Sequence, residues 1–152
     1  MNDQKKIDGK LISATLKGWI RFEVNNLLEQ NQIIPKLAVI LVGDNPASKV
    51  YVKSKSKTAQ KLGIGISDYS LPSNTNQKDL ESLIEELNND PLINGILLQL
   101  PLPGHLDTSS LLSKINPDKD VDALTPFNAG RLISGTSRLV PCTPLGSYIL
   151  IK

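Results

Sequence analysis

Cysteine and histidine are almost absent from this chain of 152 residues, which contains one of each, Cys142 and His105. A single cysteine excludes an internal disulfide and argues against a cysteine-based metal site. His105 lies in a loop rich in proline and glycine, with no second metal ligand nearby, so we expect it to be exposed to solvent. The scarcity of cysteine fits a reducing compartment, and we expect a cytoplasmic protein without a bound metal.

Long apolar runs and charge of one sign are scarce as well. No stretch approaches the roughly 18 consecutive apolar residues of a membrane-spanning helix. The N-terminal MNDQKKIDGK contains no apolar run that could serve as the core of a signal peptide. The formal net charge is +2 and the lysines are spread along the chain, which is not the pattern of a nucleic-acid-binding surface. We therefore expect no membrane and no nucleic-acid partner.

The chain does contain alternating strand and helix patterns. Apolar residues at spacings of three and four across residues 8 to 30 predict a packed helix with one apolar face. Short apolar runs predict strands, and segments with helical periodicity separate them. The predicted strands are 37–42, 66–71 and 95–100, and the predicted helices between them are 46–62 and a segment around 80–87. This order predicts an α/β fold of three layers, a mostly parallel sheet with helices on both faces.

From Pro101 onward the sequence is richer in loops, and only a short helix near residues 110 to 115 is predicted there. In the last segment, PCTPLGSYILIK, Thr143 is a plausible helix N-cap and Pro144 suits the first helical position. The apolar run then ends at Lys152 without a C-terminal stop signal. We expect residues 1–141 to form one domain and residues 142–152 to begin a truncated linker helix.

One stripe of the predicted helix 46–62 carries a candidate catalytic lysine. The stripe consists of Ala47, Tyr51, Lys55, Thr58 and Leu62, and Lys49, Lys53 and Gln60 fall on the opposite side. We expect the stripe to face the protein body. A lysine held away from bulk water beside a phenol can act in proton transfer. The spacing also fits a lysine that lays its methylenes along the core edge and keeps its ammonium in solvent.

Other polar residues near predicted strand ends allow two interpretations each. Gln99 lies inside the apolar run LLQLPLP, where an unpaired amide would cost on the order of a few kcal/mol. Either nearby backbone groups pair with it or it belongs to a site at the strand's carboxyl end. Asp120 and Asp122 alternate faces if extended, so only one can point into a pocket, although such carboxylates are often turn or cap residues. Cys142 has no histidine partner nearby, and we expect a buried small residue.

Four blocks of sequence, in one order, resemble a known enzyme family. They are VGDNPASKVYVKSKSKTAQKLGI, GILLQLPLP, PDKDVDALTPFNAGRL and PCTP. Together they resemble the bifunctional methylenetetrahydrofolate dehydrogenase/methenyltetrahydrofolate cyclohydrolase family from about Ile7 to Lys152. The resemblance implies oxidation of 5,10-methylenetetrahydrofolate with NADP and hydrolysis of the product to 10-formyltetrahydrofolate. It also implies a tetrahydrofolate derivative as ligand, a role in one-carbon metabolism and a homodimer.

The same resemblance implies roles for individual residues. Lys55 would be catalytic, helping to activate the water that attacks the methenyl carbon, and Gln99 would hold its amine by hydrogen bonding. Tyr51 would pack against the folate rings, and Asp122 would accept hydrogen bonds from the pterin N–H groups. Residues expected to line the cleft with them are Ser48, Leu100 and Pro101.

The sequence departs from the family pattern at two points. Ala123 stands where the pattern usually has glycine, which could strain a turn if the backbone there needs a positive φ. The family also continues into a Rossmann-type domain with a glycine-rich GRS-type motif and a later PGGVGPMT segment, and neither motif occurs here. We therefore expect no cofactor-binding residue in this chain, and a non-catalytic or split-enzyme folate-binding fragment is an alternative. GIGIS, at residues 63–67, fails as a dinucleotide fingerprint, which disfavours a general nucleotide-binding module.

Overall fold

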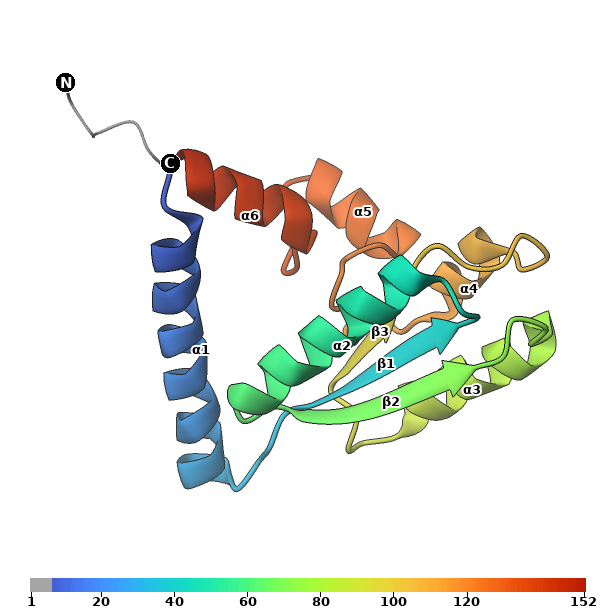
Figure 1. The fold of residues 1–152 in the computed structure, drawn as a ribbon, viewed down its shortest axis with the longest axis horizontal. Coiled ribbons are helices and arrows are strands. Elements are labelled where there is room, and N and C mark those ends of the chain that lie inside the picture. Colours follow the sequence, from blue (N-terminus) through green and yellow to red (C-terminus); the bar gives the residue numbers. More distant parts are fainter. Residues whose placement is uncertain (1–6) are drawn as a thin grey trace.

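A three-stranded parallel sheet is the centre of the molecule (Figure 1). The computed structural model describes residues 7–152, so the expectation for the N-terminal segment lies largely outside the described residues. The strands are β1 (Lys36–Val42), β2 (Gly65–Leu71) and β3 (Gly95–Leu98), in the order β2-β1-β3. All three strands were predicted, but β3 ends at Leu98, two residues earlier than expected.

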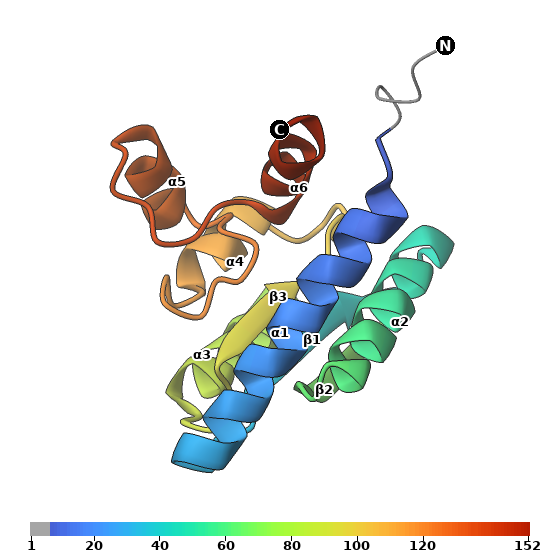
Figure 2. The same ribbon diagram turned by 90° about the vertical axis from the view of Figure 1, so that its left-hand side faces the viewer.

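Helices cover both faces of this sheet, so the predicted three-layer α/β fold is confirmed (Figures 1 and 2). Helix α2 (Pro46–Lys61) packs on one face against β1 and β2. Helices α3 (Gln77–Asn89) and α4 (Thr108–Lys114) contact one another and contribute to the core on the other face. That core is apolar, and its fully buried members include Ile40, Leu80, Ile84, Ile96 and Leu111. Burial of such side chains contributes roughly 1.5–3 kcal/mol each.

Local signals fix both ends of α2, the helix that carries the candidate lysine. The side chain of Asn45 accepts a hydrogen bond from the backbone N–H of Ser48, and Pro46 occupies the first turn, where it gives up no helical hydrogen bond. After the helix, Gly63 has a φ of +85°, a conformation that glycine adopts without strain. The predicted start and stop of this helix are therefore confirmed.

Helix α1 (Gly9–Asn31) exists as predicted but is not buried in the way its periodicity suggested. Asp8 caps its N-terminus by accepting hydrogen bonds from two backbone N–H groups. Val24 is its only buried residue, and Trp19 is 60% exposed. The helix crosses the end of the sheet where α2 finishes (Figures 1 and 2), and Arg21 donates a hydrogen bond to the carbonyl of Lys61. The expectation of a packed helix is wrong because only a narrow part of α1 touches the domain.

Beyond residue 101 the structure corrects two predictions. Residues expected to form a loop make helix α5 (Pro126–Ile133), capped by Thr125, whose hydroxyl accepts a hydrogen bond from the N–H of Asn128. Helix α6 (Cys142–Ile151) begins before Thr143, with Pro141 at the N-cap and no side-chain cap. Across residues 7–152, no helix combines the length and apolar character needed to cross a bilayer.

Candidate functional site

Lys55 and Gln99 meet at the carboxyl end of the sheet. The ammonium of Lys55, on α2, donates a hydrogen bond of 3.3 Å to Oε1 of Gln99, which follows β3. The backbone N–H of Gln99 donates to the carbonyl of Ile40, which ties this residue to the neighbouring strand. Its side-chain Nε2 donates to the carbonyl of Leu100 at 2.6 Å. Both ends of the Gln99 amide are therefore paired, one with backbone and one with the candidate lysine.

A cavity of about 370 Å³ opens beside Lys55. Opposite charges line it, because Lys55 enters from α2 and Asp122 from the loop before α5. The remaining lining residues are Leu124, Pro141, Cys142, Thr143 and Pro144. This combination of an ammonium, a carboxylate and apolar walls suits a flat polar ligand with N–H donors.

The two aspartates of the KDVD segment have different environments, and residues 121–122 form a turn instead of an extended strand. Asp120 is buried, with 2% of its surface exposed, and forms a bridge with Ile96 of β3. Its carboxylate accepts hydrogen bonds from the N–H groups of Leu124 and Thr125. Asp122 is half-buried and lines the cavity. Asp120 therefore holds the loop, while Asp122 remains available to a ligand.

Between Asp122 and the following helix, the backbone takes an unusual conformation. Ala123 has a φ of +53°, in the left-handed region that favours glycine, and it is 3% exposed. The strained turn expected from alanine at this position is present. An L-residue in this region costs roughly 1–2 kcal/mol. The local fold thus stores strain one residue from the cavity carboxylate.

Cys142 lines the same cavity but is exposed, so the expectation of a buried residue is wrong. It lies at the first position of α6, where the chain turns past the loop that carries Asp122, and its thiol contacts the carbonyl of Val121 at 3.7 Å. Desolvation raises the pKa of this thiol, the charge of Asp122 raises it further, and Lys55 opposes both effects. The pKa of the Cys142 thiol therefore depends on the charges of Asp122 and Lys55 in the cavity.

The other candidate residues lie around this centre without lining the cavity. Tyr51 is one turn from Lys55 and is 62% exposed, whereas Ser48 is buried. Leu100 is half-buried and Pro101 is exposed, directly after Gln99. The prediction that the stripe through Tyr51 and Lys55 faces the protein body is wrong. The buried residues of α2 are instead Ser48, Ser56 and Ala59. Tyr51 and Lys55 instead flank the buried face.

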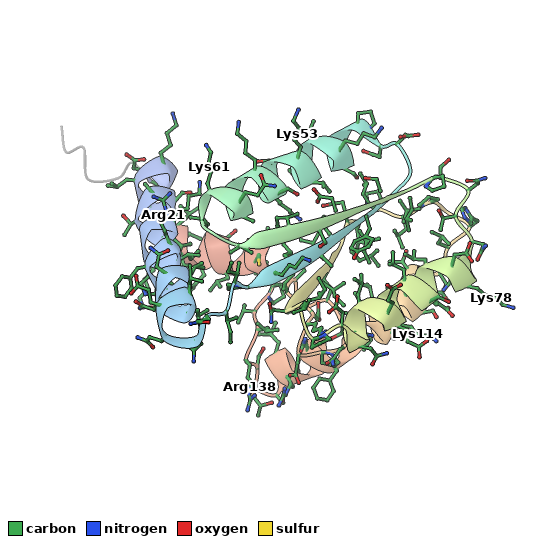
Figure 3. All side chains as sticks on the ribbon, turned by 90° about the horizontal axis from the view of Figure 1, so that it is seen from below. Arg21, Lys53, Lys61, Lys78, Lys114 and Arg138 are labelled. Atoms are coloured by element: carbon green, nitrogen blue, oxygen red, sulfur yellow. The ribbon has the colours of Figure 1, made fainter. Side chains whose placement is uncertain are left out.

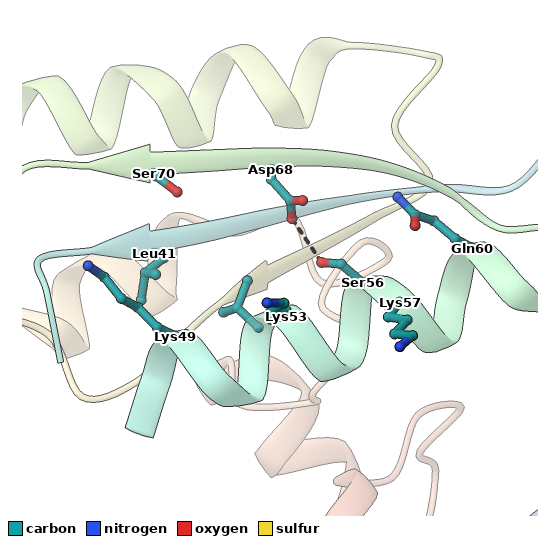
Figure 4. Close-up of a pocket in the computed structure, with 9 residues that line it drawn as sticks. Leu41, Lys49, Lys53, Ser56, Lys57, Gln60, Asp68 and Ser70 are labelled. Atoms are coloured by element: carbon teal, nitrogen blue, oxygen red, sulfur yellow. Dashed lines mark hydrogen bonds between the residues drawn. The ribbon is translucent and has the colours of Figure 1, made fainter. Parts of the chain in front are cut away.

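A second cavity of about 480 Å³ lies along α2 and the edge strand β2 (Figure 4). Lys49, Lys53 and Lys57 line it from the helix, and Asp68 and Ser70 line it from the strand. A hydrogen bond of 2.9 Å from the Ser56 hydroxyl to Asp68 crosses it. Lys55 does not line this cavity, so neighbouring lysines of one helix face two separate spaces.

Basic side chains come from elements throughout the described part of the chain (Figure 3). Those labelled in the figure belong to different elements, including α1, α2, α3 and α4. This distribution agrees with the small net charge of the chain.

Comparison with known proteins decides the family. Residues 7–122 match the family described as tetrahydrofolate dehydrogenase/cyclohydrolase, catalytic domain. The chain belongs to this family. The resemblance seen in the four sequence blocks is thereby confirmed.

Relatives of this dehydrogenase/cyclohydrolase chain share its sequence and its fold. The bifunctional protein FolD of Rhodopseudomonas palustris (strain BisB5) is 51% identical over 146 residues, which cover 96% of this chain and 50% of that protein. The crystal structure of FolD from Campylobacter jejuni is 46% identical, with a TM-score of 0.90 over 95% of this chain and 51% of that one. The Trypanosoma brucei enzyme, complexed with NADP cofactor and inhibitor, is 34% identical, with a TM-score of 0.91 over 95% of this chain and 50% of that one. The chain spans about half the length of the curated relatives it matches.

The strand-to-helix turns before α2 and α3 do not suit the phosphates of a nicotinamide dinucleotide. At the N-terminus of α2, where a phosphate would bind, the chain presents Asp44 and Pro46, a carboxylate and a residue without N–H. A hydrogen bond from Lys49 and its charge lower the pKa of Asp44, so the lysine nearest this helix end is paired with a carboxylate. The loop from β2 to α3 contains no glycine. These two turns of the family member therefore lack the features of a dinucleotide phosphate site.

Sequence reasoning missed one buried polar residue close to the site. Asn128 on α5 is 4% exposed and donates hydrogen bonds to Oδ2 of Asp120 and to the carbonyl of Pro117. Its segment was predicted to be a loop, so no inward face was assigned. The signal was present, because Thr125 and Pro126 form the same N-cap and first-turn pair as Asn45 and Pro46.

Proposed function

We propose that this chain binds a tetrahydrofolate derivative and serves the oxidation of 5,10-methylenetetrahydrofolate with NADP, followed by hydrolysis of the methenyl product to 10-formyltetrahydrofolate. One observation carries the proposal: the Lys55–Gln99 hydrogen bond borders a cavity that also exposes Asp122. The ammonium, its amide partner and a carboxylate thus lie close together in a chain of this family, which supports the roles proposed for them.

The hydrolytic step assigns proton transfer to Lys55. Water forms a bond to the methenyl carbon while the lysine amine accepts a proton from that water. The added hydroxyl then loses its proton to solvent as the bond from this carbon to N5 breaks, and the lysine returns its proton to N5. The formyl group remains on N10, and one proton is released overall. The methenyl ligand is cationic, and its charge favours the neutral form of a nearby amine. The amine and the attacked carbon must be in hydrogen-bond reach of one water for this to occur.

The neighbouring residues bind and orient in this proposal. Oε1 of Gln99 accepts the hydrogen bond from the Lys55 Nζ. The second hydrogen bond of the Gln99 side chain, from Nε2 to the carbonyl of Leu100, fixes the rotamer of Gln99. Asp122 accepts hydrogen bonds from the pterin N–H groups, a match that a carboxylate makes well. Tyr51 packs against the folate rings, and its exposed ring is free to do so. The edge of the ligand site is assigned to Ser48, Leu100 and Pro101.

The hydride transfer requires residues beyond those described here. NADP would accept hydride from the methylene carbon, but the turns before α2 and α3 do not suit its phosphates. No step through the dinucleotide is assigned to the residues of this chain. The same misfit favours a second candidate function, a folate-binding unit that is not catalytic by itself or that acts with a separate dinucleotide-binding chain.

A binding and turnover experiment separates these functions. The purified chain is titrated with tetrahydrofolate by calorimetry, and the loss of the methenyl chromophore is followed with and without NADP. Binding together with accelerated loss of the chromophore supports a cyclohydrolase, and binding without acceleration supports the non-catalytic or split-enzyme candidate. An absence of binding at millimolar tetrahydrofolate contradicts both.

A further inference from the structure

A buried carboxylate organises the loop that carries Asp122. Oδ1 of Asp120 accepts from the N–H of Leu124 at 3.1 Å, and Oδ2 accepts from the N–H of Thr125 at 2.8 Å. Oδ2 also accepts from Nδ2 of Asn128 at 2.9 Å. Three donors thus converge on one carboxylate that is 2% exposed. Hydrogen bonds to a charged, buried acceptor are among the stronger ones in proteins.

Asn128 closes the loop from its other side. Its second amide hydrogen bond goes to the carbonyl of Pro117, so one side chain ties residue 117 to residue 120 across the start of α5. The N–H of Ala123 donates to the carbonyl of Asp120, and Ala123 takes its left-handed conformation inside this closed loop. Asp122 lies between these fixed points. Its direction toward the Lys55 cavity is therefore set by bonds that Asp122 itself does not make.

We infer that Asp120 and Asn128 are positioning residues for ligand recognition: they hold the backbone at 122–123 so that the Asp122 carboxylate faces the cavity beside Lys55. The inference rests on the proposed function, in which Asp122 binds the pterin. It assigns no contact with the ligand to Asp120 or Asn128. Both side chains act through the loop, because their polar atoms are already committed to Leu124, Thr125 and Pro117.

A role limited to stability would leave a different signature. Substituting a residue that only stabilises the fold changes the free energy of unfolding, and its effect on ligand binding adds to that of an Asp122 substitution. Substituting a residue that acts through Asp122 has no further effect on binding once Asp122 is itself replaced. The central apolar cluster contains no member of the 117–128 loop, so this loop is not the main source of stability. A double-mutant cycle between positions 120 and 122 therefore distinguishes the two roles.

The experiment uses the full chain with D120N, D122N and the double variant, at a temperature where circular dichroism shows all of them folded. D120N replaces one carboxylate oxygen by an NH2 group, which then faces N–H donors that the carboxylate accepted from. Tetrahydrofolate affinity is measured by calorimetry. We expect D120N and D122N each to weaken binding by about tenfold or more, and the double variant to be no weaker than D122N alone. D118N, the same change at an exposed position of the loop, is the control and should bind like the unchanged chain.

A second measurement needs no ligand. The charge of Asp122 raises the pKa of Cys142, so displacement of Asp122 should make this thiol easier to alkylate. D120N should accelerate iodoacetamide labelling as D122N does, with no further acceleration in the double variant. If D120N does not fold, N128A takes its place, since it removes one of the three bonds to Asp120.

The outcomes separate the two proposals. Failure of the unchanged chain to bind tetrahydrofolate contradicts the proposed function, and the inference with it. Binding that D122N weakens, but that D120N leaves unchanged, overturns the inference alone. Additive effects of D120N and D122N, in binding and in labelling, also overturn it, because they assign Asp120 to general stability.

Discussion

Replacing Lys55 by methionine removes one charge from the ligand cavity while keeping most of the side-chain length. The change deletes the 3.3 Å hydrogen bond to Gln99 and leaves Oε1 of that residue without the lysine donor. The other amide bond of Gln99, to the carbonyl of Leu100, is unaffected. The fold and the chemistry should therefore respond to this substitution very differently.

The effect on stability should be small. Lys55 is half-buried, and its bond to Gln99 is long, so the lost interaction is at the weak end of bonds to charged groups. We expect the free energy of unfolding to fall by about 1 kcal/mol or less. For a chain of this size that corresponds to a Tm shift of at most about 4 °C. Thermal denaturation followed by circular dichroism measures the shift.

The effect on turnover should be large if Lys55 transfers the proton. Loss of a positioned general acid–base group costs about 10²–10⁴-fold in rate. Loss of the methenyl chromophore, measured under conditions where the unchanged chain accelerates it, should therefore slow by at least about 100-fold in K55M. Tetrahydrofolate affinity should change much less, because the lysine acts on the reacting carbon and Asp122 binds the pterin.

K53M is the matched control. It makes the same change two residues away on the same helix, but Lys53 lines the other cavity, along β2 (Figure 4). K53M should keep both stability and turnover. Full activity of K55M, or equal loss in K53M and K55M, would refute proton transfer by Lys55.

Three further predictions concern the cavity loop and its supports. Burial and the charge of Asp122 raise the pKa of Cys142, so at pH 8 the thiolate is scarce, and iodoacetamide labelling should be slower than for free cysteine and faster in D122N. The Lys119 ammonium donates to two carbonyls at the end of α3, so K119M should lower the free energy of unfolding, measured in urea, by about 1–2 kcal/mol. The control K114M, at an exposed lysine, should change it by less than about 0.5 kcal/mol. A123V should cost about 2 kcal/mol or more, because a β-branched residue resists a φ of +53° in a buried position, while A123G should stay within about 1 kcal/mol of the unchanged chain; equal stabilities of the two would contradict the strained turn.

The parts of the fold that were predictable are those with a local physical cause. Strand β1 is an uninterrupted apolar run, which only a sheet covered on both faces accommodates easily. Helix α2 carries its own start signal at Asn45 and its stop at Gly63. Helix α5 carried a comparable start signal at Thr125 but is only eight residues long, and a short helix among turns leaves little periodicity to detect.

The site was predictable only in part. Spacing on α2 placed Tyr51 and Lys55 on one stripe, but the choice of buried face depends on what packs against the helix, and small residues such as Ser56 and Ala59 sit closest to the sheet. The contact between Lys55 and Gln99 joins residues 44 positions apart, and the resemblance supplied it because no local pattern does. Asp120 and Asp122 do differ in environment, but residues 121–122 form a turn, so the alternation of an extended chain is not the cause.

Helix α1 shows why an apolar stripe predicts a helix more securely than it predicts burial. The periodicity is a property of one segment, whereas burial requires a second surface of matching length and direction. Leu11 and Trp19 line a groove that Ile149 of α6 also lines, yet both remain mostly exposed. The closest packing of α1 on the domain is farther along the helix, at Arg21 and Val24. The Lys55 cavity has a different origin: its walls come from α2, the loop around Asp122 and the start of α6. A substitution on the exposed face of α1 should therefore leave that cavity intact, whereas one at the buried Asp120 or Asn128 should not.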